Sequence, residues 1–193
     1  MRTAMGLARI ALPLALVLAA AACNRPEQPA DAPADAPAAP AANAFSYAST
    51  ADLSGFYLPP EEVRIGKWSF DHIFVGQAAE FQAWKGAETE TTFAPVMIEF
   101  SDTTSPMVES EMGESRSIKA RVLPTRYVVS DDKIEFEGTA PELGAVRFEG
   151  RIDQGALATS RRNLGDEGVV VIGTLTAAGQ TLRDVKLRWW MGD

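Results

Sequence analysis

The sequence predicts an all-β domain over residues 45–193, built as a single antiparallel barrel or β-sandwich of about eight to ten strands. Apolar and polar residues alternate with period two over most of this region, which is the pattern of strands with one buried face. Pro, Gly, Asn and Asp residues separate these runs at regular intervals, and no run has the length and spacing of an ordinary amphipathic helix.

The middle of the domain predicts a meander of antiparallel strands. In residues 145–153, Val146 and Phe148 alternate with charged residues, as expected of a half-buried strand. The Pro and Gly within residues 139–144 predict the turn before it. Strands are expected over residues 117–123, 126–130, 133–138 and 145–153.

The last two predicted strands cover residues 168–176 and 181–191, with a short turn between them. The uninterrupted apolar run 169–172 predicts a central position, buried on both faces. Alternation in the final strand predicts that Trp189 points inward and Trp190 outward.

Earlier in the domain, residues 67–76 and 95–101 are predicted as strands. In the first, the alternation places Trp68, Phe70, His72 and Phe74 on one face. Residues 78–85 fit either a helical turn or a strand. Residues 102–117 have no sustained period and are predicted to form a long polar loop.

Residues 1–22 predict a signal peptide, because a basic start is followed by a short apolar run and then by small residues. A membrane span needs about 20 apolar residues, and this run is shorter and contains Pro13. The run Ala20-Ala21-Ala22-Cys23 resembles a bacterial lipobox, although Ala20 stands where that motif prefers a large aliphatic residue. The resemblance implies a lipoprotein whose membrane anchor is a diacylglycerol on the chain's one cysteine. Ordinary cleavage after Ala22, which leaves Cys23 as a free thiol, is the alternative.

Residues 23–44 are then expected to form a disordered linker rich in Pro and Ala, which tethers the domain to the membrane. In the lipoprotein comparison, Asn24 is not the aspartate that resembles an inner-membrane retention signal. By that analogy the protein is expected in the cell envelope, on the outer membrane and facing the periplasm. The chain has a net formal charge of −8, which repels nucleic acid, so none is predicted as a partner of the mature protein.

No catalytic constellation is visible in the sequence. There is one histidine, His72, with no G-x-S-x-G elbow, and no spacing typical of zinc or calcium ligands. No catalytic residue, metal site or cofactor is therefore predicted. The face of Trp68, Phe70, His72 and Phe74 is a candidate ligand-binding surface, and the alternative is that these side chains form the core. The outward Trp190 is a further candidate contact.

Two runs resemble the YceI-like family of periplasmic barrels. One is Gly173-Thr174-Leu175-Thr176 with Gly179, Thr181, Val185 and Leu187, and the other is Phe70-Asp71-His72-Ile73 with Gly76 and Phe81. The resemblance implies a lipocalin-like barrel that holds a polyisoprenoid chain, with Phe70, His72 and Phe74 lining the cavity. The chain departs from the family in having one histidine and in lacking the family's Phe-Phe and Tyr-Pro stretch.

The function expected from the sequence is binding by a lipid-anchored envelope domain, with an apolar small molecule as the ligand. A protein-interaction or scaffolding role in envelope assembly is the first alternative, and an envelope hydrolase that depends on His72 is the second.

Overall fold

The prediction of an all-β domain is confirmed by the computed structural model, which describes residues 44–84, 91–110 and 113–192. The described part contains two short helices, α1 (Ala78–Ala83) and α2 (Gln154–Arg162). Its strands are β1 (Phe45–Ala48), β2 (Gly55–Leu58), β3 (Val63–Ile65), β4 (Trp68–Val75), β5 (Val96–Asp102), β6 (Met107–Ser110), β7 (Gly113–Arg116), β8 (Lys119–Val122), β9 (Pro124–Ser130), β10 (Lys133–Ala140), β11 (Gly144–Ile152), β12 (Val169–Ala177) and β13 (Gln180–Trp190).

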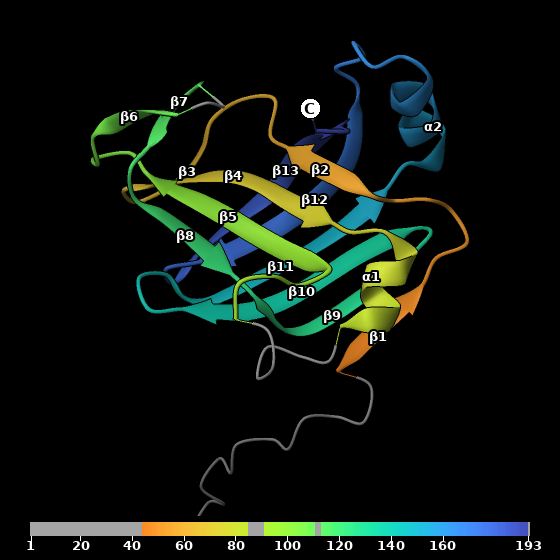
Figure 1. Ribbon diagram of the computed structural model, residues 1–193, viewed down its shortest axis with the longest axis horizontal. Coiled ribbons are helices and arrows are strands. Elements are labelled where there is room, and N and C mark those ends of the chain that lie inside the picture. The colour runs from red at the N-terminus through yellow and green to blue at the C-terminus, as the bar shows by residue number, and fades with distance from the viewer. Residues whose placement is uncertain (1–43, 85–90, 111–112, 193) are drawn as a thin grey trace, which may run out of the picture. The chain divides into compact units, whose positions relative to one another are not determined.

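Eleven of these strands form one sheet that curls into a half-barrel (Figure 1). Ten follow the order β1-β9-β10-β11-β12-β13-β2-β4-β5-β8, and β3 pairs with β4 beside β2. The sheet has more strands than the expected eight to ten, and it is mixed because β1 runs parallel to β9. A separate hairpin of β6 and β7 lies at the β3–β5 end of the molecule in Figure 1.

The inner side of the curl holds the hydrophobic core, a continuous cluster of apolar side chains drawn from almost every strand of the sheet. Its largest aromatic members are no more than 1% exposed: Tyr57, Phe70, Phe100, Phe136 and Phe148. On β10 and β11 the outer side carries the polar half of the alternation, as the period-two pattern predicts.

Two paired glycines allow the sheet to curl tightly around this core. Gly150 of β11 and Gly173 of β12 are cross-strand partners. A Cβ at either position would lie 2.6 or 2.7 Å from the ring of Phe148, so that ring covers the space that side chains would need. Glycine kinks are a known means of curving a sheet, and an aromatic ring packed over the glycines helps to fix the register there.

The central placement of the last two strands is confirmed, because β12 and β13 lie in the middle of the sheet order. The prediction that the apolar run 169–172 is buried on both faces is wrong, since Ile172 is 48% exposed. The half-barrel covers the inner face alone, and an outward side chain on a central strand therefore still meets solvent.

Two helices and a hairpin correct or complete the sequence prediction. Of the two alternatives for residues 78–85, the helical one is found, as the short helix α1. A capping box between Gln77 and Glu80 stabilises its first turn. Helix α2 was not predicted: it buries only Leu157 and Ser160, so its sequence lacks an apolar stripe. The predicted loop 102–117 contains β6 and β7, whose described side chains are largely exposed and so show no alternation.

Candidate functional site

The strand β4 does not carry its four aromatic residues on one face. Its register against β5 shifts between Phe70 and His72, which marks a β-bulge. Asp71 and His72 are consequently both partly exposed, while Phe70 and Ile73 on either side are buried. The prediction of a shared face is wrong, because the extra residue in the bulge reverses the alternation after Phe70.

The bulge divides the predicted ligand-binding residues into two groups. Trp68 and Phe70 belong to the core, where the ring centroid of Phe70 lies 5.7 Å from that of Phe100. His72 and Phe74 lie on the outer side of the sheet. Trp190 is also partly exposed there, which agrees with its predicted outward direction.

Four apolar side chains lie side by side on this outer face and are named here the apolar row: Trp190, Phe56, Phe74 and Met97. They come from the adjacent strands β13, β2, β4 and β5, and each is the direct cross-strand partner of the next. All four are partly exposed. The sheet therefore brings together residues from distant parts of the chain into one apolar band that water can reach.

Phe56 is the centre of the row. Its ring centroid lies 5.3 Å from that of Phe74, 5.7 Å from that of Trp190 and 5.1 Å from that of His72. Phe56 is not among the site residues predicted from the sequence, because no strand was predicted over residues 55–58. The available signal was the short aromatic run between Gly55 and Pro59.

A polar line runs beside the row on the same face. His72 of β4 pairs with Glu99 of β5, and Glu99 pairs with Arg121 of β8. Glu99 is only 6% exposed, and its two oxygens accept from Lys119 Nζ and Arg121 Nη2, each at 3.0 Å. A buried carboxylate with two cationic donors is firmly held in position.

The environment shifts the titration of these groups in definite directions. Burial raises the pKa of Glu99, but the hydrogen bonds and charges of Lys119 and Arg121 outweigh it, so the net pKa is lowered. Burial lowers the pKa of His72, the nearby Glu99 opposes this, and the two cations add to it. The imidazole is therefore biased toward its neutral form.

Asp71 lies next to this line and is held by Ser101, whose hydroxyl donates to the carboxylate Oδ2. Burial raises the pKa of Asp71, and the bond from Ser101 and the charge of Lys119 only partly offset it. The two carboxylates of this face thus have pKa values displaced in opposite directions.

A groove of about 410 Å³ opens over these polar groups, and it is named here the His72 groove. Its floor is formed by side chains of β4, β5 and β8: Ser69, Asp71, His72, Glu99, Ser101 and Lys119. The β6–β7 hairpin adds Met107, Ser115 and Arg116 as a wall.

The two carboxylates of this face do not form a free acid and base pair. Opposite pKa shifts on two carboxylates are typical of an acid and base pair. However, both oxygens of Glu99 already accept hydrogen bonds from Lys119 and Arg121, so Glu99 is not free to act as the base of such a pair. The neutral imidazole of His72 is the remaining base beside Asp71. Among the described residues, no group of three or more His, Cys, Asp or Glu side chains is placed to hold a metal ion.

The predicted signal peptide 1–22, the predicted lipidation site Cys23 and all of the predicted linker 23–44 except Ala44 lie outside the described residues. In the part of the chain that the structure covers, no helix is long and apolar enough to span a bilayer. The chain matches no protein-family model, no curated protein and no solved structure. The resemblance to YceI-like barrels therefore stays a prediction.

Proposed function

We propose that this protein is a lipid-anchored binding module of the cell envelope, and that it binds a protein partner through the outer face of β13, β2, β4 and β5. The observation that carries the proposal is the apolar row, in which Trp190, Phe56, Phe74 and Met97 are consecutive cross-strand partners that remain partly exposed. Contiguous exposed apolar surface on a soluble domain is typical of an interaction site.

The composition of the row favours a protein partner. Trp, Phe and Met are enriched at the centres of protein interfaces, and Arg is enriched beside them. Arg121 and Arg188 flank the row, on β8 and on β13. An apolar small molecule is favoured less, because such ligands are usually enclosed on most sides, whereas the row is one face of a sheet.

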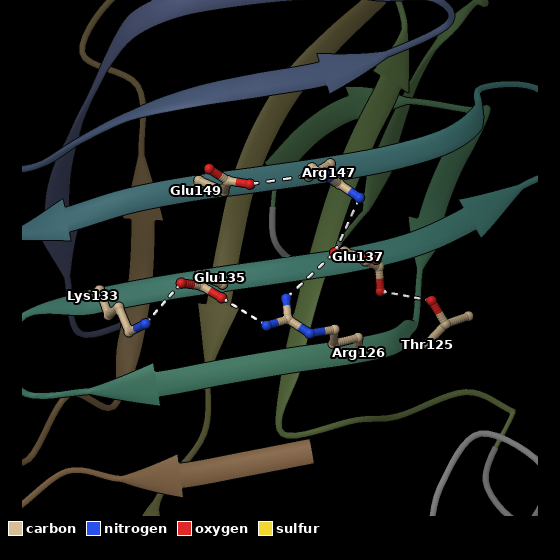
Figure 2. Close-up of polar contacts among 7 residues, drawn as sticks. All are labelled: Thr125, Arg126, Lys133, Glu135, Glu137, Arg147 and Glu149. Carbon is tan, nitrogen blue, oxygen red and sulfur yellow. Dashed lines mark hydrogen bonds and ion pairs between the residues drawn. The ribbon is translucent and has the colours of Figure 1, made fainter. Parts of the chain in front are cut away.

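The outer face elsewhere on the sheet has a different character. On β9, β10 and β11 it carries a ladder of ion pairs, in which Glu137 accepts from Arg126 at 3.4 Å and from Arg147 at 3.2 Å (Figure 2). Arg126 and Lys133 both pair with Glu135 in the same ladder. Charges that satisfy one another leave little for a partner to recognise, so the ladder serves solubility and the row serves binding.

The anchor is part of the proposal and has its own test. Metabolic labelling with an alkynyl fatty acid should label the wild-type chain and fail to label Cys23→Ser, and the variant should appear in the periplasmic fluid. An unlabelled wild-type chain that is free in the periplasm would contradict the anchor but not the binding face.

Photo-crosslinking in intact cells tests the binding face. A benzophenone-bearing phenylalanine analogue is introduced at the position of Phe74 or of Met97 in the row. The matched controls carry it at Ile172 and Thr174, on the outer face of β12 away from the row. A protein adduct of one discrete mass is expected from the row positions and not from the controls. Identical adducts from both sets, or none from the row, would refute the proposal.

A further inference from the structure

The His72 groove offers a set of hydrogen-bonding groups that are already fixed in place. Asp71 is held by Ser101, and Glu99 is held by Lys119 and Arg121. Ser69, Thr103 and Ser115 add further hydroxyls around it. Groups that are ordered before binding lose little conformational entropy when a ligand arrives.

The charges that line the groove are close to balance. The carboxylates of Asp71 and Glu99 line the groove together with the cations of Lys119 and Arg116, and Glu62, which also lines it, is paired with Arg64 at 3.2 Å. A strongly anionic or cationic ligand would meet groups of its own sign at short range. A neutral ligand rich in donors and acceptors would instead form charge-assisted hydrogen bonds with both kinds of group.

The floor of the groove does not suit an extended peptide. Peptides that bind to sheets usually add as a strand at a free edge, through main-chain hydrogen bonds. Here β4 is paired with β2 and β3 on one side and with β5 on the other, and β5 lies between β4 and β8. The strand β8 stands at the end of the sheet order, but Lys119 is the one floor residue that lies on it, so recognition over the rest of the floor must use side chains.

From these observations we infer that the His72 groove is a binding site for a neutral oligosaccharide, whose hydroxyl groups bond to Asp71, Ser101 and Lys119. The volume of about 410 Å³ lies toward the lower end of the range for small-molecule sites and suits a short stretch of sugar chain. The site is separate from the proposed protein contact, which uses the apolar row beside it.

Calorimetric titration of the purified full chain tests the inference. The probes are three neutral tetrasaccharides, namely chitotetraose, cellotetraose and maltotetraose, with the cationic glucosamine tetramer and a sulfated tetrasaccharide as charged counterparts. At least one neutral probe should bind saturably, and the charged probes should bind about tenfold more weakly or not at all. Saturable binding of a charged probe alone would overturn the inference, as would the absence of saturable binding by all three neutral probes.

Three variants show whether such binding occurs in the groove. Asp71→Asn removes a charged acceptor, and Ser101→Ala removes the hydroxyl that orients it. Each substitution should therefore weaken binding of the neutral probe about tenfold. Glu149→Gln, on the exposed outer face of β11, is the matched control and should bind like the wild type. Equal binding by all three variants would place the sugar elsewhere and refute the inference. Circular dichroism spectra establish that each variant is folded.

Discussion

Phe56 of β2 and Trp190 of β13 are cross-strand partners with ring centroids 5.7 Å apart, although they are separated by most of the domain in sequence. Their contact joins the first half of the folded chain to its last strand on the outer side of the sheet. Because both side chains stand on paired strands, the surface that they form is held rigidly and needs no rearrangement before it binds.

The first prediction concerns Gly55, which has a φ of +137° and lies under Trp189. A Cβ at this position would stand 2.3 Å from the indole Nε1, which donates to the carbonyl of Ser54 at 2.9 Å. Gly55→Ala should therefore lower the free energy of unfolding by about 1–3 kcal/mol or more, through overpacking and backbone strain. Urea unfolding measures this.

Gly66→Ala is the matched control for Gly55. Gly66 also has a positive φ, of +61°, but no atom lies within 4 Å of its added Cβ. Gly66→Ala should lower the free energy of unfolding by about 1 kcal/mol, through backbone strain alone. Equal losses for the two variants would show that the indole does not constrain position 55.

The second prediction concerns Glu99. Glu99→Gln removes a charged acceptor from Lys119 and Arg121 and should cost about 1–3 kcal/mol at pH 7. Because the folded pKa of Glu99 is lowered, its stabilising effect is present above its ordinary pKa of 4.5 and is lost as the pH falls through the folded value. The difference between the two proteins should therefore shrink in unfolding curves measured below pH 4.5. A difference that is constant with pH would contradict this assignment.

The third prediction concerns Asp71 and has the opposite sign. Its pKa is raised above the ordinary 3.8 by burial, so ionisation costs stability as the pH rises through the folded value. Asp71→Asn keeps an acceptor for Ser101 and should be at least as stable as the wild type at pH 7. Relative to the wild type, the variant should gain stability as the pH rises above 3.8, the ordinary pKa of the carboxyl, and through the higher folded value. A variant that is less stable at pH 7 would show that the carboxylate stabilises the fold.

The fourth prediction concerns the ion-pair ladder of Figure 2. Glu137→Gln breaks the contacts to Arg126 and Arg147, whose side chains are 38% and 56% exposed. Exposed pairs contribute little, so the change should be within about 1 kcal/mol and should vanish at high salt. A large effect that is insensitive to salt would mean that the ladder also supports the core.

The sequence was sufficient to predict the strands β4, β5 and β8 to β13, but not the short strands β1, β2, β3, β6 and β7, nor the face that each side chain of β4 occupies. Between Trp68 and Val75 both phases of the alternation contain apolar residues, since Ile73 and Val75 oppose His72 and Phe74. The bulge that decides between the two phases depends on pairing with β5, which lies more than 20 residues further along the chain. In β13 the alternation predicted the direction of Trp190 correctly, because the outward positions before it, Lys186 and Arg188, are charged.

The candidate site was harder to predict than the fold for a related reason. The apolar row and the His72 groove are formed by cross-strand neighbours from β13, β2, β4, β5 and β8, and no local motif encodes which strands become neighbours. The hairpin that walls the groove was predicted as a loop, because largely exposed strands leave no hydrophobic pattern to detect.

The most direct test of the binding face is the affinity of the crosslinked partner, once purified, for three forms of the full chain. Phe56→Ser removes the centre of the row, and Ile172→Ser removes an exposed apolar side chain elsewhere on the same outer face. Binding by Phe56→Ser should be about tenfold weaker or more, whereas Ile172→Ser should bind like the wild type. Equal affinity of all three folded proteins, or an equal loss in both variants, would contradict the account.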